Sequence, residues 1–232
     1  MTEPVDLLER PIYGLGQVDW LLALSPGTAR RWIDGYERAG KHYQPVIRIE
    51  STGEETVTWG EFVETRLLSE YRDAGVPMLR LRPAVDRLRD ELGLAYPLAY
   101  AKPFVWGKEL VLRIQDEVSI PKKLALVVAR NNQVVLTDPA DNFLRSVEYE
   151  GEDGAIQRMH PLPELRHVVI DPLRRFGDPV VRSVPTEVIA EQVRAGDSIE
   201  MIGELYELSR DQVEAAIRYE LIRGRPATEP AA

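Results

Sequence analysis

The 232-residue sequence has no cysteine and only three histidines, which are His42, His160 and His167. Without thiols the chain cannot form disulfide bonds, thiolate metal sites or a cysteine nucleophile, and such a composition is typical of a reducing cytoplasm. No two histidines lie three or four positions apart, so the sequence offers no helical zinc pair.

Long apolar runs are missing too. No uncharged stretch is long enough to cross a bilayer, and the acidic first six residues do not resemble a signal peptide. We therefore expect a cytoplasmic protein with no membrane partner.

The patterns that carry much enzyme chemistry are also absent. The chain has neither a P-loop nor the glycine pattern of a dinucleotide site. The acidic pairs Glu54-Glu55 and Glu152-Asp153 stand in predicted turns, as solvated carboxylates do. We expect no catalytic residues, no metal and no cofactor, and an enzyme housed in the middle of the chain is the least favoured hypothesis.

Basic charge is scarce overall, but it is concentrated in one place. The formal net charge is −9, whereas residues 25–48 carry five basic and two acidic side chains. Totals mislead when charge is uneven, so a nucleic-acid contact over this segment is compatible with an acidic chain.

The same segment has the spacing of a helix-turn-helix. Val18, Leu21 and Leu22 form one helical face, and Ser25-Pro26 is a typical N-cap and first-turn pair for a second helix. Two short helices joined by three to four residues match the motif. In the second helix Ala29, Trp32 and Ile33 are expected inside, and the outward side chains are expected to be Thr28, Arg30, Arg31 and Asp34.

A β-hairpin is expected to follow as a wing. Residues 46–49 have a strand-like pattern that could pair with residues 55–58, and this hairpin would carry Lys41, Tyr43 and Arg48. Outward arginines near the start of a second helix suit the major groove. The spacing alone leaves two alternatives open, a DNA reader or a small helical core with surface arginines.

Residues 15–32 resemble the winged helix-turn-helix of MerR-like regulators. The sequence departs from that family at Asp19, where a small residue is usual, and at Ala23, where the turn usually has glycine. The resemblance implies operator DNA as a partner. The predicted DNA-binding residues are Thr28, Arg30, Arg31, Arg38, Lys41, Tyr43 and Arg48.

Two further helices complete the predicted first domain, residues 10–95. Thr58 and Glu61 form a capping box for a helix that runs to about Asp73, and a second helix with apolar spacing ends at Gly93. The middle region, residues 96–166, is expected to be rich in β-hairpins, over 104–114, 125–136 and 147–159, with a short helix from Asp138.

Three helices are expected in the C-terminal region, residues 167–225. They would open at Pro185, at an Asp197–Glu200 capping box and at a Ser209–Gln212 capping box. The last two helices have helix-turn-helix spacing, with Leu205 and Leu221 among the residues expected inside. Residues 171–232 carry a net charge of −4, which favours a protein partner over DNA. Residues 226–232 are expected to form a disordered tail.

The segment from Val169 to Ser209 closely resembles a short bacterial family of antitoxins that pair with PIN-like ribonuclease toxins. Here Ser183-Val184 replaces the longer, arginine-containing loop of that family. The resemblance implies a VapB-type antitoxin, whose arginines could block the acidic metal site of a toxin. The predicted toxin-binding residues are Arg182, Arg210, Arg218, Arg223 and Arg225.

The sequence thus predicts an α+β protein with a winged helix-turn-helix, a hairpin-rich middle and a C-terminal three-helix module. The predicted function is an antitoxin that neutralises a PIN-like ribonuclease and represses its own operon as a homodimer. A ligand-sensing, MerR-like transcriptional regulator without a toxin is the alternative.

Overall fold

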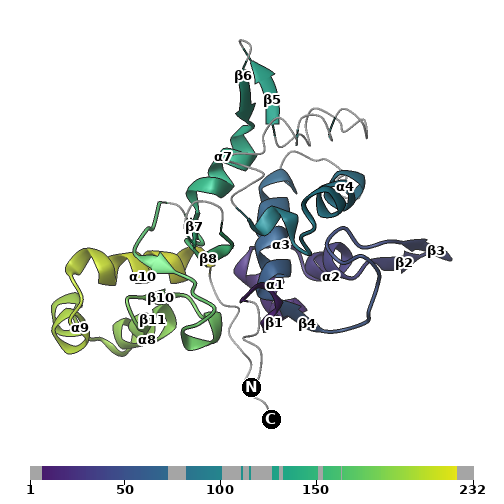
Figure 1. Cartoon of the computed structure of the whole chain (residues 1–232). Coiled ribbons are helices and arrows are strands. Elements are labelled where there is room, and N and C mark those ends of the chain that lie inside the picture. The colour runs from purple at the N-terminus through teal and green to yellow at the C-terminus, as the bar shows by residue number, and fades with distance from the viewer. Residues whose placement is uncertain are drawn as a thin grey trace, which may run out of the picture. The chain divides into compact units, whose positions relative to one another are not determined.

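A computed structural model describes residues 7–72, 82–100, 111, 115, 127–130, 133–150, 154–162 and 164–223. The chain divides into two compact units, residues 1–157 and 158–232. Helices and small antiparallel sheets are present in both, which confirms the α+β class (Figure 1). The sequence-based boundaries at 95/96 and 166/167 stay predictions.

The first unit opens with the expected pair of helices. A short η1 (Leu7–Glu9) leads through β1 (Pro11–Gly14) into α1 (Leu15–Leu21), and α2 (Thr28–Ile33) follows. Val18, Leu21 and Ala29 are buried between them, as their spacing predicts. The strand β1 pairs antiparallel with β4 (Thr56–Thr58).

A two-residue hairpin follows α2. The strands β2 (Tyr36–Arg38) and β3 (Lys41–Tyr43) pair with Arg38 opposite Lys41. The turn residues Ala39 and Gly40 have φ values of +52° and +71°, the signature of a type I′ turn. The wing is therefore shorter and earlier than predicted, because residues 46–49 form no strand and β4 pairs with β1 instead.

The helix α3 (Trp59–Arg72) forms the centre of the first unit. Thr58 and Glu61 make the predicted capping box, with Thr58 N donating to Glu61 Oε2 over 2.9 Å and Glu61 N donating to Thr58 Oγ1 over 3.2 Å. Trp59 and Phe62 are fully buried, and Tyr13 packs on Phe62. The next elements are α4 (Arg82–Leu92), which ends before Gly93 as predicted, and η3 (Pro97–Ala99).

The described part of the middle region contains two of the three expected hairpins. The strands β5 (Val127–Arg130) and β6 (Gln133–Leu136) pair, and so do β7 (Val147–Tyr149) and β8 (Ile156–Met159). The predicted helix from Asp138 is α7 (Asp138–Arg145). Most of 104–114 lies outside the described residues, and Val111 within it is helical rather than extended.

The second unit combines a three-stranded sheet with three helices. The sheet consists of β9 (Val168–Val169), β10 (Val180–Val181) and β11 (Val184–Pro185), and η5 (Arg175–Gly177) lies in the loop between β9 and β10. The helices are α8 (Thr186–Ala195), α9 (Ile199–Tyr206) and α10 (Arg210–Arg223). Their shared core includes Val181, Ile189, Ile202 and Tyr219.

Three local predictions in the second unit are wrong. Ser198, not Asp197, caps α9, because its Oγ accepts a hydrogen bond from the Met201 amide over 3.2 Å. Leu205 and Leu221 were expected inside but are exposed. In α10 the face that packs on α8 instead buries Tyr219 and Glu220, and the Glu220 carboxylate accepts a hydrogen bond from the Thr186 hydroxyl.

Within the part of the chain that the structure describes, no helix is long and apolar enough to cross a membrane.

Candidate functional site

The start of α2 is held by a carboxylate from α1. Asp19 is 7% exposed, and its two oxygens accept hydrogen bonds from the amides of Gly27 (2.6 Å) and Ala29 (2.7 Å). Gly27 itself has a φ of +77° and stands at the N-cap. The prediction that Ser25 caps this helix and Pro26 begins it is wrong, because the cap comes from Asp19 across the turn.

The exposed face of α2 carries two arginines. Arg30 and Arg31 are both exposed, as predicted. Arg30 forms an ion pair with Glu55, and Arg31 Nη2 donates to Thr28 Oγ1 over 2.7 Å. Thr28 was expected to face outward, but it is 6% exposed and serves as a support for Arg31. The exposed face of this helix therefore offers two guanidiniums, and Thr28 is buried against Arg31.

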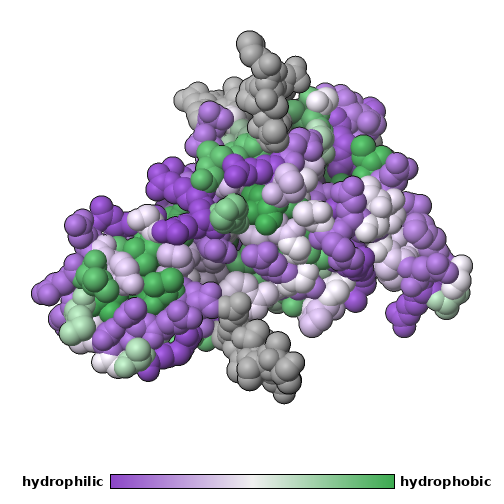
Figure 2. Space-filling view, turned by 90° about the horizontal axis from the view of Figure 1, so that it is seen from below, coloured by the Kyte–Doolittle hydropathy of each residue, from purple (hydrophilic) through white to green (hydrophobic). Residues whose placement is uncertain are grey.

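The hairpin next to α2 is also cationic and polar. Arg38 and Lys41 are exposed at its tip. At its base the rings of Tyr36 and Tyr43 stack with centroids 4.6 Å apart, and Lys41 Nζ lies 5.3 Å from the centre of the Tyr43 ring. Figure 2 shows the projecting hairpin as a mainly hydrophilic surface. A cationic tip above a base of stacked tyrosines is suited to a phosphate backbone.

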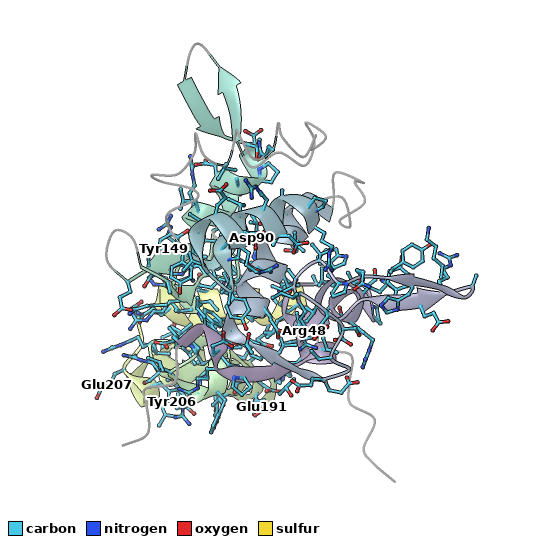
Figure 3. The ribbon with its side chains drawn as sticks, turned by 45° about the vertical axis from the view of Figure 1, so that its right-hand side comes forward. Arg48, Asp90, Tyr149, Glu191, Tyr206 and Glu207 are labelled. Atoms are coloured by element: carbon cyan, nitrogen blue, oxygen red, sulfur yellow. The ribbon has the colours of Figure 1, made fainter. Side chains whose placement is uncertain are left out.

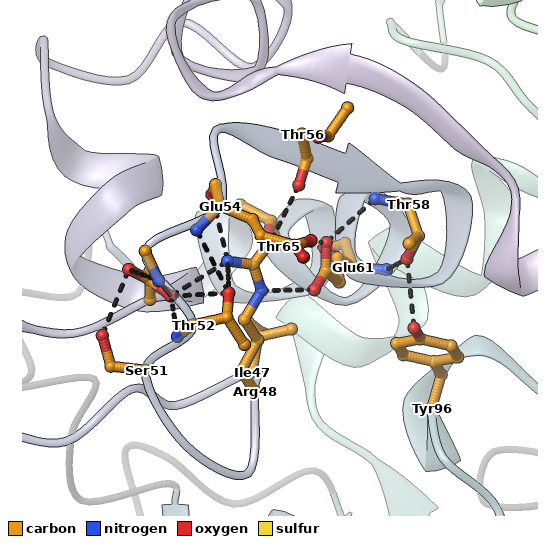
Figure 4. A network of polar contacts seen from close by, with 12 residues as sticks. Ile47, Arg48, Ser51, Thr52, Glu54, Thr56, Thr58, Glu61, Thr65 and Tyr96 are labelled. Carbon is orange, nitrogen blue, oxygen red and sulfur yellow. Dashed lines mark hydrogen bonds and ion pairs between the residues drawn. The ribbon is translucent and has the colours of Figure 1, made fainter.

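The placement of Arg48 on the wing is wrong. Its side chain is 8% exposed and lies at the centre of a polar network (Figure 4). Nε donates to Glu61 Oε1 over 2.6 Å, and Nη1 donates to Asp34 Oδ1 over 2.9 Å. The remaining bonds go to Thr52 Oγ1 and to the carbonyls of Glu54 and Thr56. The buried Arg48 guanidinium therefore connects the end of α2, residues 51–56 and the first turn of α3.

Asp34 also differs from its predicted place, because it is 4% exposed instead of facing outward. Burial alone would raise its pKa, but hydrogen bonds from the Thr52 amide, from Arg48, from Gly53 and from Ser51 lower the pKa below its ordinary value. Burial alone would lower the pKa of Arg48, but its hydrogen bonds and ion pairs with Glu61 and Asp34 raise the pKa above its ordinary value. Each group thus keeps its charge inside the protein through its partners.

Glycine is required where the chain passes from α2 into the hairpin. Gly35 has a φ of +79°, and a Cβ placed there would stand 2.5 Å from the carbonyl oxygen of Tyr43. After the hairpin the chain returns to α2, where the Trp32 carbonyl accepts from the amides of Val46 (2.8 Å) and Ile47 (3.0 Å). Figure 3 shows Arg48 near the base of the projecting hairpin. The hairpin and α2 are therefore joined closely at the backbone.

The helix α4 fixes the same returning segment from its other side. Arg82 donates to the carbonyls of Pro45 and Ile49, the latter over 2.6 Å. Arg89 Nη2 donates to the Ile47 carbonyl over 2.8 Å. A cavity of about 490 Å³ adjoins this region, and its lining includes Arg48, Thr58, Glu61 and Tyr96.

The four predicted toxin-binding arginines that the structure describes do not form one cluster of unpaired cations. Arg210 is exposed and pairs with Glu200 (3.0 Å) and Glu214 (2.8 Å), and Arg218 lies 3.7 Å from Glu214. Arg182 donates to the Glu207 carbonyl over 2.8 Å, and Arg223 lies over the Tyr219 ring. Arg225 lies outside the described residues.

The sequence analysis missed the roles of Asp19, Asp34 and Glu61 in fixing α2. The departure at Asp19 from the family pattern was the available signal, since a carboxylate next to Val18 on the buried side of α1 can reach the start of the next helix. No group of three or more possible metal ligands occurs among the described residues.

Two family models match separate parts of the chain. Residues 11–85 match the family described as "Putative DNA-binding HTH domain", and residues 168–219 match "Protein of unknown function (DUF433)". The protein Rv2308 of Mycobacterium tuberculosis, described as uncharacterized, is 39% identical over 221 residues, which cover 92% of this chain and 91% of Rv2308. This chain belongs to the Rv2308 family.

Two further matches are more distant. A protein of the same organism described as "Putative antitoxin VapB45" is 28% identical and aligns over 89% of this chain and 92% of its own length. The crystal structure of Rv2018 from M. tuberculosis has 25% identity and a TM-score of 0.74, and the match covers 91% of this chain and all of that one. The predicted resemblance to VapB-type antitoxins with an N-terminal helix-turn-helix is thereby confirmed.

Proposed function

We propose that this protein is an antitoxin that binds the operator of its own operon through α2 and the β2–β3 hairpin. The exposed cationic surface of these two elements carries the proposal. It is formed by Arg30 and Arg31 on the helix and by Arg38 and Lys41 on the hairpin. The match of residues 11–85 to a helix-turn-helix family supports the same conclusion.

The DNA contacts divide by chemistry. Arg31, steadied by Thr28, is the candidate for a guanine edge in the major groove, and Arg30 is the candidate for a phosphate once it leaves Glu55. Arg38 and Lys41 suit the phosphates next to the groove, with Tyr43 as their support. Thr28 and Arg48 are positioning residues in this proposal, because both are buried.

Fluorescence anisotropy with a duplex from the chain's own promoter tests the DNA proposal. The R30A/R31A double variant should lose at least tenfold in affinity, and loss of Arg31 alone should cost about 1–3 kcal/mol if it reads a base. The R145A variant is the matched control, because Arg145 is an exposed, ion-paired arginine on α7. Undiminished binding by R30A/R31A would contradict the proposal.

The second part of the proposal is neutralisation of a PIN-like ribonuclease by the C-terminal unit. It rests on the antitoxin named among the relatives and on the net negative charge of residues 171–232, which disfavours phosphates. The full chain should co-purify with the protein encoded next to it and suppress its ribonuclease activity. A homodimer is part of the proposal because one short recognition helix covers too little DNA for tight binding.

A ligand-sensing regulator without a toxin remains the second candidate, and the cavity beside Arg48 is the observation that favours it. A ligand there would contact the network that fixes α2. If the adjacent gene encodes a nuclease and this chain inhibits that nuclease, the antitoxin function is supported over the ligand-sensing regulator.

A further inference from the structure

The loop between β9 and β10 presents two large apolar side chains to solvent. Leu173 is 65% exposed and Phe176 is 80% exposed. Among the described residues Phe176 is the most exposed large apolar side chain. An aromatic ring left in water on a folded module is a feature that a binding partner would explain.

The backbone of this loop adopts a rare conformation. Arg175, Phe176 and Gly177 have consecutive φ values of +47°, +54° and +79°. The turn is closed by hydrogen bonds from Gly177 N to the Arg174 carbonyl (2.9 Å) and from Asp178 N to the Arg175 carbonyl (3.0 Å). Left-handed backbone is unfavourable for side chains with a Cβ, and such strain concentrates at functional sites.

A buried carboxylate holds the strained turn in place. Asp171 is 5% exposed, and its Oδ1 accepts from the Leu173 amide over 2.9 Å. Its Oδ2 lies 3.0 Å from Arg158 Nε and 3.4 Å from Arg174 Nε. The loop therefore holds Leu173 and Phe176 in one arrangement before any partner arrives, which lowers the entropic cost of binding.

The surroundings of the ring indicate the chemistry of the partner. Arg174 and Arg175 directly precede Phe176, and both are exposed, with Arg174 in a 3.4 Å ion pair with Asp171. An aromatic anchor beside arginines is the composition of an interface hot spot, and its complement is an apolar pocket with an acidic rim. A nucleic acid fits less well, since residues 158–223 carry nine basic and twelve acidic side chains.

We propose that Leu173 and Phe176 are the apolar anchor by which this unit docks into an acid-rimmed pocket on its protein partner. The proposal rests on the proposed function, since the partner is the nuclease that the antitoxin would inhibit. It places the main contact on the β9–β10 loop instead of on the ion-paired arginines of α10.

Titration calorimetry of the full-length chain with the purified product of the adjacent gene tests this anchor. The F176A variant should raise Kd at least 30-fold, which corresponds to about 2 kcal/mol, and L173A should raise it about tenfold. The F176Y variant keeps the ring and should stay within about threefold. The L205A variant is the control, because Leu205 is a 62% exposed leucine on α9 of the same unit, and it should bind like the wild type.

The outcomes separate the two proposals. If the wild-type chain does not bind the adjacent product, the proposed function fails together with the anchor. If the wild type binds and F176A binds equally well, the anchor is overturned and the antitoxin function stands. Light scattering on F176A that shows a lost dimer, or a loss of RNA binding with the nuclease complex intact, also overturns the anchor, because the occupant is then a second copy or a nucleic acid. Thermal unfolding should be unchanged in F176A, since its side chain is exposed.

Discussion

The Oδ1 atom of Asp19 lies 2.7 Å from the amide nitrogen of Ala29, so a carboxylate of α1 caps the start of α2. We expect D19A to lower the free energy of unfolding by about 1–3 kcal/mol, because two amides at a buried helix end lose their acceptor. D19N keeps one acceptor and should cost less. Urea denaturation measures both, and promoter binding should weaken in the same order. D138A, at the exposed start of α7, should cost no more than about 1 kcal/mol.

Arg48 should matter for stability more than any arginine of α2. R48M leaves Asp34 and Glu61 buried without their shared cation, and we expect a loss of about 3–5 kcal/mol in the free energy of unfolding. The free energy of unfolding of R48K should lie between those of R48M and the wild type, because an ammonium keeps the charge but cannot make the several hydrogen bonds of the guanidinium. An R48M protein as stable as the wild type in urea would contradict this role.

The same network predicts a pH dependence on the acid side. The folded-state pKa of Asp34 is lowered, so this group contributes stability above its unfolded pKa, and the contribution is lost as the pH falls through the lowered value. Denaturation from pH 5 down to pH 2 should therefore show a shallower decline in D34N than in the wild type. D138N, at an exposed position, should follow the wild-type curve.

The ion pair of Arg30 with Glu55 should compete with DNA. Both side chains are largely exposed, so the pair itself is weak, and E55Q should bind the promoter up to about fivefold more tightly. E91Q removes a carboxylate that pairs with Arg87 on α4, and it should leave the affinity unchanged. A tighter complex in both variants would point to net charge rather than to the release of Arg30.

Glu64 predicts a second pH effect, of opposite sign. Its side chain is fully buried, which raises its pKa to about 8, and Oε1 accepts the Leu98 amide over 3.0 Å. Oε2 has no hydrogen-bond partner among the described residues. The folded protein keeps a proton that the unfolded chain loses above its ordinary pKa, so stability falls as the pH rises from about 4.5 to about 8.

E64Q should remove this decline. Glutamine keeps the acceptor for Leu98 and carries no proton to lose, so we expect E64Q to be more stable than the wild type at pH 8 by roughly 2–4 kcal/mol. The two proteins should be equally stable near pH 4.5. E37Q, on the exposed hairpin, should follow the wild-type curve at every pH.

The elements that sequence reasoning located well are those with local signals. The capping boxes at Thr58–Glu61 and Ser209–Gln212 mark helix starts that the structure confirms, because both partners lie within one turn. The hairpin over 127–136 and the helix from Asp138 follow from similarly local patterns.

Most of the failures involve partners distant in sequence, and the cap of α9, Ser198 instead of Asp197, is a local exception. Asp34, Arg48 and Glu61 have ordinary surface composition, and only the packing of α2 on α3 makes them a buried network. In α10 the apolar spacing allows two faces, and the contact with Thr186 selects the one that buries Glu220. The fold class and the cationic helix were therefore predictable, but the separation of exposed from supporting residues was not.

The close approach at Gly35 also bears on how such proteins diversify. A methyl group there would meet the Tyr43 carbonyl oxygen at 2.5 Å and the ring of Pro45 at 3.0–3.1 Å, so the chain after α2 and the end of the hairpin approach each other through backbone atoms and Pro45. In the proposed DNA complex, exchange of surface side chains can alter which bases or phosphates the two elements touch, but not the interval between them. A relative that recognises a longer or shorter half-site would need an insertion or a deletion in residues 34–45, and not a substitution.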